Sequence, residues 1–221
     1  MTKLDIANMS RRDALALGLV LFGTAATGSL ISFPAFAQGA PAQAQQIANH
    51  FSSVKTMAGE FVQFGPRGEQ TGGKFYISRP GKIRFDYEAP SSYKVISDGT
   101  SVVIDNRKLN TSDLYPLSKT PLKLLLDERI DLSGGRVTNV KEEPDLTTIQ
   151  IADRQVFGNS RITMMFDPKN YELRQWTITD AQGKDTTVMI FNVQQGVSLD
   201  PGMFVIDYKR NRVVNEQRRK G

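Results

Sequence analysis

The segment of residues 72–99 constrains the fold most strongly, because apolar and polar side chains alternate along it in two successive stretches. The apolar positions recur at every second residue, first at Phe75 and Ile77 and then at Ile83, Phe85 and Tyr87. This period of two is typical of a strand with one apolar and one solvated face. The chain turns at Pro80-Gly81 and again at Asp98-Gly99, a dipeptide that favours tight hairpins. The segment therefore predicts consecutive antiparallel strands.

Arg79 is the exception in this pattern. Counting by twos from Phe75 places Arg79 on the same face as Phe75 and Ile77. A guanidinium on an apolar face is costly unless its donors find acceptors. Arg79 is therefore the residue whose position most needs a structural explanation.

Most of the remaining chain also has the pattern of short strands separated by turn residues. Further strands are expected at residues 57–63, 93–97, 100–105, 114–117, 136–142, 147–153, 161–167, 172–180, 186–193 and 203–206. So many sequential strands predict a mainly β protein built on one strongly curved antiparallel sheet.

Two helices are expected to cover the apolar face of this sheet. The first runs from about Pro41 to Thr56, since Ile47, Phe51 and Val54 recur at helical spacing. The second is short and rich in leucine, with Thr120 as N-cap and Pro121 at the first helical position.

The N-terminal residues 1–37 have the pattern of a cleaved export signal. Arg11 and Arg12 precede an apolar stretch of residues 14–30, and Ala35-Phe36-Ala37 is a typical cleavage site. A membrane anchor is the alternative. Residues 10–15 also resemble a twin-arginine signal, although Ala14 stands where that motif prefers phenylalanine, which leaves both export routes open. The mature protein is expected to be soluble in the periplasm.

The chain is therefore expected to divide into a signal peptide at 1–37, one folded domain at 38–208 and a basic tail at 209–221. The tail is weakly patterned and is expected to be mobile.

The composition disfavours most catalytic and metal chemistry. The chain has no cysteine and a single histidine, His50, which leaves no cluster suited to a metal, a cofactor or a catalytic triad. Nucleic-acid binding is also disfavoured despite a net charge of +5, because the basic residues at positions 82 and 84 fall on the solvated face. A non-enzymatic carrier of a small molecule or lipid fits a curved apolar face with a helical cover. A closed core without a cavity stays open as the alternative.

The sequence resembles the LolA family of periplasmic outer-membrane lipoprotein carriers along essentially the whole expected mature chain. The most specific part is Arg79-Pro80-Gly81-Lys82-Ile83-Arg84-Phe85-Asp86-Tyr87 followed by Ser97-Asp98-Gly99. Further matching positions are Phe61-Val62-Gln63, residues 73–77, Pro90, Thr120-Pro121-Leu122, Phe166-Asp167, Trp176 and Leu199-Asp200 with Phe204.

The resemblance implies an unclosed half-barrel whose concave apolar face is covered by short helices acting as a lid. It implies that Arg79 hydrogen-bonds to the lid backbone and holds the empty cavity shut. The residues expected to line the acyl-chain cavity are Ile47, Phe51, Phe61, Phe75, Ile77, Ile83, Phe85, Tyr87, Val95, Leu122, Leu125, Leu126, Met164, Phe166 and Trp176.

The resemblance also implies the task and the partners. A monomer of this family takes acylated lipoproteins from an inner-membrane ABC-type release complex and delivers them to the outer membrane, where an acceptor is present in some systems. A half-barrel of the same shape that binds another lipid or senses lipoproteins is the alternative function.

Overall fold

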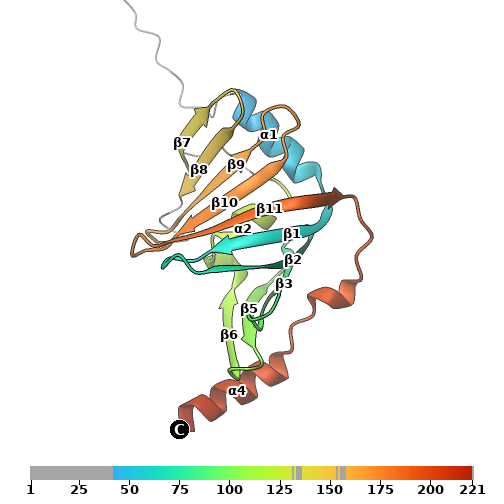
Figure 1. Ribbon diagram of the computed structural model, residues 1–221, viewed down its shortest axis with the longest axis vertical. Coiled ribbons are helices and arrows are strands. Elements are labelled where there is room, and N and C mark those ends of the chain that lie inside the picture. Colours follow the sequence, from blue (N-terminus) through green and yellow to red (C-terminus); the bar gives the residue numbers. More distant parts are fainter. Residues whose placement is uncertain (1–41, 131, 133–135, 153, 155–157, 221) are drawn as a thin grey trace, which may run out of the picture. The chain divides into compact units, whose positions relative to one another are not determined.

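An antiparallel sheet of eleven strands forms the body of the part of the chain that the structure describes (Figure 1). The computed structural model describes residues 42–130, 132, 136–152, 154 and 158–220. These residues belong to a unit that spans Gln38–Gly221. The expected signal peptide at 1–37 lies outside the described residues.

The strands follow the sequence in two meanders that meet in the middle of the sheet. The order across the sheet is β6-β5-β4-β3-β2-β1-β11-β10-β9-β8-β7, so β1 and β11 join the two meanders. The strands are β1 (Thr56–Phe64), β2 (Gln70–Ser78), β3 (Lys82–Tyr87), β4 (Tyr93–Asp98), β5 (Ser101–Asn106), β6 (Thr111–Pro116), β7 (Val137–Glu142), β8 (Thr147–Ala152), β9 (Arg161–Phe166), β10 (Leu173–Thr179) and β11 (Asp185–Gln195). Because β6 and β7 are edges that do not pair with each other, the sheet is open, which confirms the expected unclosed half-barrel.

The helices lie where this topology requires them. Helix α1 (Ala42–Ser53) precedes the central strand β1, whereas the short helices η1 (Leu117–Lys119) and α2 (Leu122–Leu126) lie in the connection between the edge strands β6 and β7. A connection that joins opposite edges of a curved sheet must cross one of its faces. Here α2 crosses the apolar face and places Leu124, Leu125 and Leu126 in the core.

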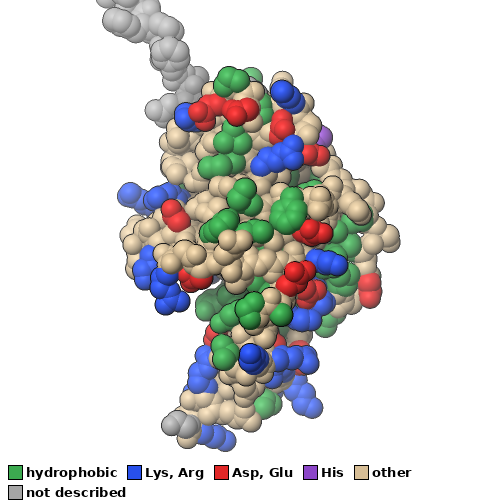
Figure 2. Space-filling view, in the orientation of Figure 1, with side chains coloured by type: hydrophobic (Ala, Val, Ile, Leu, Met, Phe, Trp, Pro, Cys, Tyr) green, Lys and Arg blue, Asp and Glu red, His purple; other side chains and the backbone are tan. Residues whose placement is uncertain are grey.

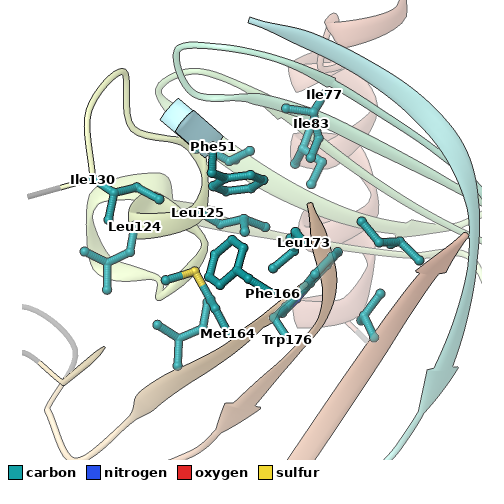
Figure 3. Packing of buried hydrophobic residues seen from close by; sticks show 14 of the residues in the cluster. Phe51, Ile77, Ile83, Leu124, Leu125, Ile130, Met164, Phe166, Leu173 and Trp176 are labelled. Carbon is teal, nitrogen blue, oxygen red and sulfur yellow. The ribbon is translucent and has the colours of Figure 1, made fainter. Parts of the chain in front are cut away.

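The core fills the space between the sheet and these helices. Phe51 of α1 lies against Phe166 of β9, with ring centroids 5.5 Å apart, and Leu125 of α2 lies close to both (Figure 3). Trp176 of β10 and Met164 of β9 extend this cluster and are at most 1% exposed. The apolar face of the sheet is therefore covered by α1 and α2.

The start of α2 differs by one residue from the expectation. Its N-cap is Pro121, which makes no side-chain cap, whereas the Thr120 hydroxyl donates to the Leu117 carbonyl of the preceding turn. The Thr120 side chain therefore bonds to η1 and does not cap α2, so the prediction of Thr120 as the N-cap is wrong.

The C-terminal region departs further from the structure expected from the sequence. The strand expected at residues 203–206 is a 3-10 helix, η2 (Pro201–Phe204), because the Asp200 carboxylate accepts from the Gly202 amide at its start. Phe204 and Ile206 are both buried, and their spacing of two imitates a strand.

The expected mobile tail is a helix, α4 (Tyr208–Lys220), which packs on the edge strand β6. Asn211 and Asn215 both donate side-chain hydrogen bonds of 2.9 Å to the Ser112 carbonyl, and Val214 is buried. The helix therefore covers part of a strand edge that would otherwise present unpaired backbone groups. Its contact face is mostly polar, with Asn211, Asn215, Arg210 and Arg218 beside Val214, so the sequence shows no apolar periodicity there.

The turn at Gly81 packs closely against Gly99, and this close approach can be tested by substitution. Gly81 has φ 78°, and a Cβ there would lie 2.7 Å from the Cα of Gly99 in the neighbouring hairpin. Gly183 has the same φ but open space around it, so Gly183→Ala isolates the backbone strain of about 1–2 kcal/mol. We expect the free energy of unfolding of Gly81→Ala to fall by roughly a further 1–3 kcal/mol, because the added methyl group overpacks the turn. Equal losses for the two variants in urea unfolding would contradict the close approach.

Candidate functional site

The side chain of Arg79, at the end of β2, joins the two covering segments to the sheet. Its Nη1 donates to the Val54 carbonyl, just after α1, at 2.6 Å, and its Nη2 donates to the Leu125 carbonyl of α2 at 3.1 Å. The guanidinium carbon also lies 4.2 Å from the centre of the Phe51 ring, a cation–π geometry. One side chain therefore contacts both helical segments at once.

Arg79 is only 6% exposed, and burial lowers its pKa to about 10. It stays protonated at neutral pH, so the core contains a cation. Its Nε is buried without a hydrogen-bond partner among the described residues. The two carbonyls and the Phe51 ring thus offset only part of the cost of removing this charge from water.

Backbone contacts at the same place reinforce the connection. The Arg79 amide donates to the Lys55 carbonyl at 2.8 Å, and the Gly81 amide donates to the Leu126 carbonyl at 2.9 Å. The turn between β2 and β3 therefore contacts the end of α2 through both backbone and side chain.

An apolar cavity of about 640 Å³ lies between the sheet and the start of α2. Its lining comes from the β1–β2 hairpin, from β3 to β6, from β10 and β11, and from the segment that leads into α2. The lining residues are Gln63, Gly65, Pro66, Glu69, Thr71, Phe85, Tyr87, Pro90, Ser91, Tyr93, Val95, Val102, Ile104, Tyr115, Thr120, Leu122, Trp176, Ile178, Thr186 and Val188. Tyr93 and Tyr115 are 39% and 47% exposed and mark the opening to solvent.

The fifteen residues expected to line an acyl cavity separate into two groups in the structure. Those in contact with the cavity are Phe85, Tyr87, Val95, Leu122 and Trp176. The others form the closed core around α1 and α2, namely Ile47, Phe51, Phe61, Phe75, Ile77, Ile83, Leu125, Leu126, Met164 and Phe166. The cavity thus borders the packed core, and residues such as Phe85 and Trp176 belong to both.

Several lining residues were not expected from the sequence. Ile178 follows Trp176 at a spacing of two on β10, so alternation could have identified it. Val102 and Ile104 on β5 and Val188 on β11 lie in runs of consecutive apolar residues, where alternation does not show which residue faces the cavity. Pro66 and Pro90 lie in loops, where no periodicity indicates which way a residue faces.

The cavity wall contains a half-buried polar pair. The Tyr87 hydroxyl donates to the Gln63 side-chain carbonyl at 2.6 Å, and Tyr87 packs edge-to-face on Phe61. Burial raises the pKa of Tyr87 to about 12. The wall therefore has a neutral hydrogen-bonding group among apolar side chains.

A search of the described residues for a metal site finds no group of three or more His, Cys, Asp or Glu side chains that could hold an ion. Among the same residues, no helix is long and apolar enough to cross a membrane.

The fold and the cavity define a class of protein: an open antiparallel half-barrel with an apolar pocket partly covered by helices. Residues 52–207 match the family model described as outer membrane lipoprotein carrier protein LolA, and the chain belongs to this family.

Named relatives agree with this assignment. The outer-membrane lipoprotein carrier protein of Methylococcus capsulatus is 25% identical over 79% of this chain and 90% of its own length. The protein of the same name from Chromobacterium violaceum is 28% identical over 75% of this chain and 84% of its own. A solved LolA superfamily protein from Nitrosomonas europaea superposes with a TM-score of 0.41 at 10% identity, covering 75% and 98% of the two chains. The family assignment depends on the sequence matches and not on this superposition.

The raised pKa of Tyr87 predicts a pH-dependent stability. Between about pH 10 and 12 the unfolded chain loses the Tyr87 proton while the folded chain keeps it, so stability falls as the pH rises through this range. A Tyr87→Phe variant lacks this contribution. Over this pH range we therefore expect the free energy of unfolding to fall by on the order of 2 kcal/mol more in the wild type than in the variant. Urea unfolding at a series of pH values measures the difference, and parallel curves would contradict it.

Proposed function

We propose that this protein carries acylated lipoproteins across the periplasm, with their acyl chains bound in the apolar cavity between the sheet and α2. The observation that supports this proposal most directly is the cavity of about 640 Å³ in a chain of the lipoprotein carrier family. The protein receives its cargo from an inner-membrane ABC-type complex and delivers it to the outer membrane. It acts as a monomer without cofactor or catalysis.

The size of the cavity suggests that cargo binding involves movement of the covering helices. Most of the residues expected to contact acyl chains pack against α1 and α2 in this structure. Displacing α2 would add their surface to the cavity. Arg79, which bonds the carbonyls of Val54 and Leu125, would have to release these groups.

We call this contact of Arg79 with the carbonyls of Val54 and Leu125 the latch. The latch would also make it easier for the protein to release its cargo. Burying acyl chains gains about 0.8 kcal/mol per methylene, so several long chains would bind too tightly to be handed on. If binding must first break the contacts of the closed form, the net affinity falls by the free energy of those contacts. The closed form then favours delivery.

Arg79→Leu tests the latch. It removes two hydrogen bonds to buried carbonyls, each worth about 1–2 kcal/mol, so we expect cargo retention to strengthen on the order of tenfold or more and transfer to slow. The measurement is release of a purified, loaded lipoprotein to an acceptor. Arg174→Leu is the control, because Arg174 is also a hydrogen-bonded arginine, pairing with Asp167 at 2.9 Å, but does not line this cavity. Unchanged release in Arg79→Leu would reject the latch.

The cargo itself is tested by purifying the protein from the periplasm of its host and identifying bound molecules by mass spectrometry. We expect triacylated or diacylated lipoproteins in near-stoichiometric amounts. A Val95→Asp variant should lose them, because a carboxylate then faces the acyl chains. Val62→Asp is the control and should keep the bound lipoproteins, because Val62 does not line the cavity. Free phospholipid or another small lipid in place of lipoprotein would reject the carrier function while leaving the cavity intact.

A further inference from the structure

A second hollow lies on the opposite face of the sheet, beneath the segment that leads into α4. Its volume is about 210 Å³, and its walls come from β3 to β6, from residues 205 and 207, and from α4. Arg84 and Lys94 line it, whereas their chain neighbours Phe85 and Val95 line the apolar cavity. Because successive strand residues face opposite sides, the two hollows are separated by the sheet. We call this second hollow the basic pocket.

The basic pocket has an excess of positive charge. Its lining contains four basic side chains, Arg84, Lys94, Arg107 and Arg210, and two acidic ones, Asp105 and Asp207. Figure 2 shows that Lys and Arg side chains also gather around α4. That helix carries six basic residues and one acidic residue. The surroundings thus increase the positive potential at the pocket.

The nearby carboxylates are shared between cations. Asp105 accepts from Arg210 Nε at 3.0 Å and lies 3.9 Å from Arg107 Nε. Asp86 lies at the edge of the group and pairs with Arg84 at 2.8 Å and with Lys94 at 3.4 Å. Even with Asp86 included, four cations meet three carboxylates. The group therefore has a formal net charge of +1, and among the described residues only Asp86 and Asp105 form ion pairs with its cations.

Arg210 lines the basic pocket and carries a donor left unsatisfied in the part of the chain that the structure describes. Its Nε bonds Asp105 and its Nη1 bonds the Asn110 side chain, but its Nη2 is buried without a hydrogen-bond partner among the described residues. A buried guanidinium donor without an acceptor costs free energy that an anionic oxygen would recover. The Arg210 side chain as a whole is 24% exposed although Nη2 itself is buried, so an anion has to reorient the guanidinium to reach this donor.

We propose that the basic pocket binds a phosphate group, with Arg210 and Lys94 as its principal ligands and Arg84 and Arg107 supplying further charge. Arginine is suited to such an oxyanion because its planar donors match two phosphate oxygens. The phosphate belongs either to a soluble phosphate ester or to a phospholipid headgroup. In the second case the site would bring α4 against an anionic bilayer. This inference is independent of the proposed acyl-chain cavity.

Titration calorimetry of the purified chain with inorganic phosphate and with glycerol 3-phosphate tests the site. We expect saturable binding that weakens about tenfold in Arg210→Gln, the loss of one charge-assisted hydrogen-bonding partner. Lys94→Gln should weaken binding similarly and does not alter the contacts between α4 and β6. Arg218→Gln is the matched control, because Arg218 is on the same helix and pairs with Asp113 at 2.9 Å outside the pocket.

Vesicle sedimentation distinguishes the two sources of phosphate. Binding to phosphatidylglycerol vesicles but not to phosphatidylcholine vesicles, lost in Arg210→Gln and kept in Arg218→Gln, identifies a lipid headgroup. Saturable binding of glycerol 3-phosphate without vesicle binding identifies a soluble ester. Both results support the pocket. The absence of saturable binding by any of these probes, or equal weakening in Arg210→Gln and Arg218→Gln, would overturn the proposal.

Discussion

The position of the covering helices depends on the guanidinium of Arg79. A cation 6% exposed is stable in an apolar environment only where acceptors surround it, and the acceptors here are backbone carbonyls of two different segments. The interaction is therefore specific in geometry, since Val54 and Leu125 must both be in place. It is also limited in strength, since Nε has no hydrogen-bond partner in the described part of the chain. A contact that is specific but incompletely compensated has the properties that the proposed latch requires.

The topology explains why this contact can form at all. The link from β6 to β7 has to cross between opposite edges of the sheet, which brings α2 over the apolar face, while α1 enters the same region from the start of β1. The β2–β3 turn lies at the end of the central strands and contacts both segments. One arginine at that turn thus reaches two elements that are separated by about seventy residues in sequence.

Much of this arrangement is predictable because the strands have one apolar face. The alternation of Phe75, Ile77, Ile83 and Phe85 identifies both the strands and their buried side, and it also shows that Arg79 faces inward. Which of the inward residues surround an open cavity and which form a closed core is not predictable in this way. Ile83 and Phe85 have the same pattern, yet only Phe85 lines the cavity, because the helices above them set the boundary.

The C-terminal region was mispredicted for a related reason. Helix α4 packs on a strand edge mainly through polar side chains, which bond to the Ser112 carbonyl and to the side chains of Ser112 and Asp113. Asn211 and Asn215 suit that surface, and in sequence they are indistinguishable from solvated residues. The basic pocket shares this property, since it forms only when the segment before α4 folds over charged positions of β3 to β5.

The two faces of the sheet therefore have opposite physical requirements. On the concave face, apolar burial supplies the free energy, and the cost of burying the charge of Arg79 offsets part of it. On the convex face, the walls of the basic pocket are mostly charged, with the apolar side chains of Ile96, Val103 and Val205 among them. Each strand from β3 to β5 contributes to both through alternate residues. A substitution that alters the register of one of these strands by one residue would exchange the two faces, so the cavity and the basic pocket constrain the same strands together.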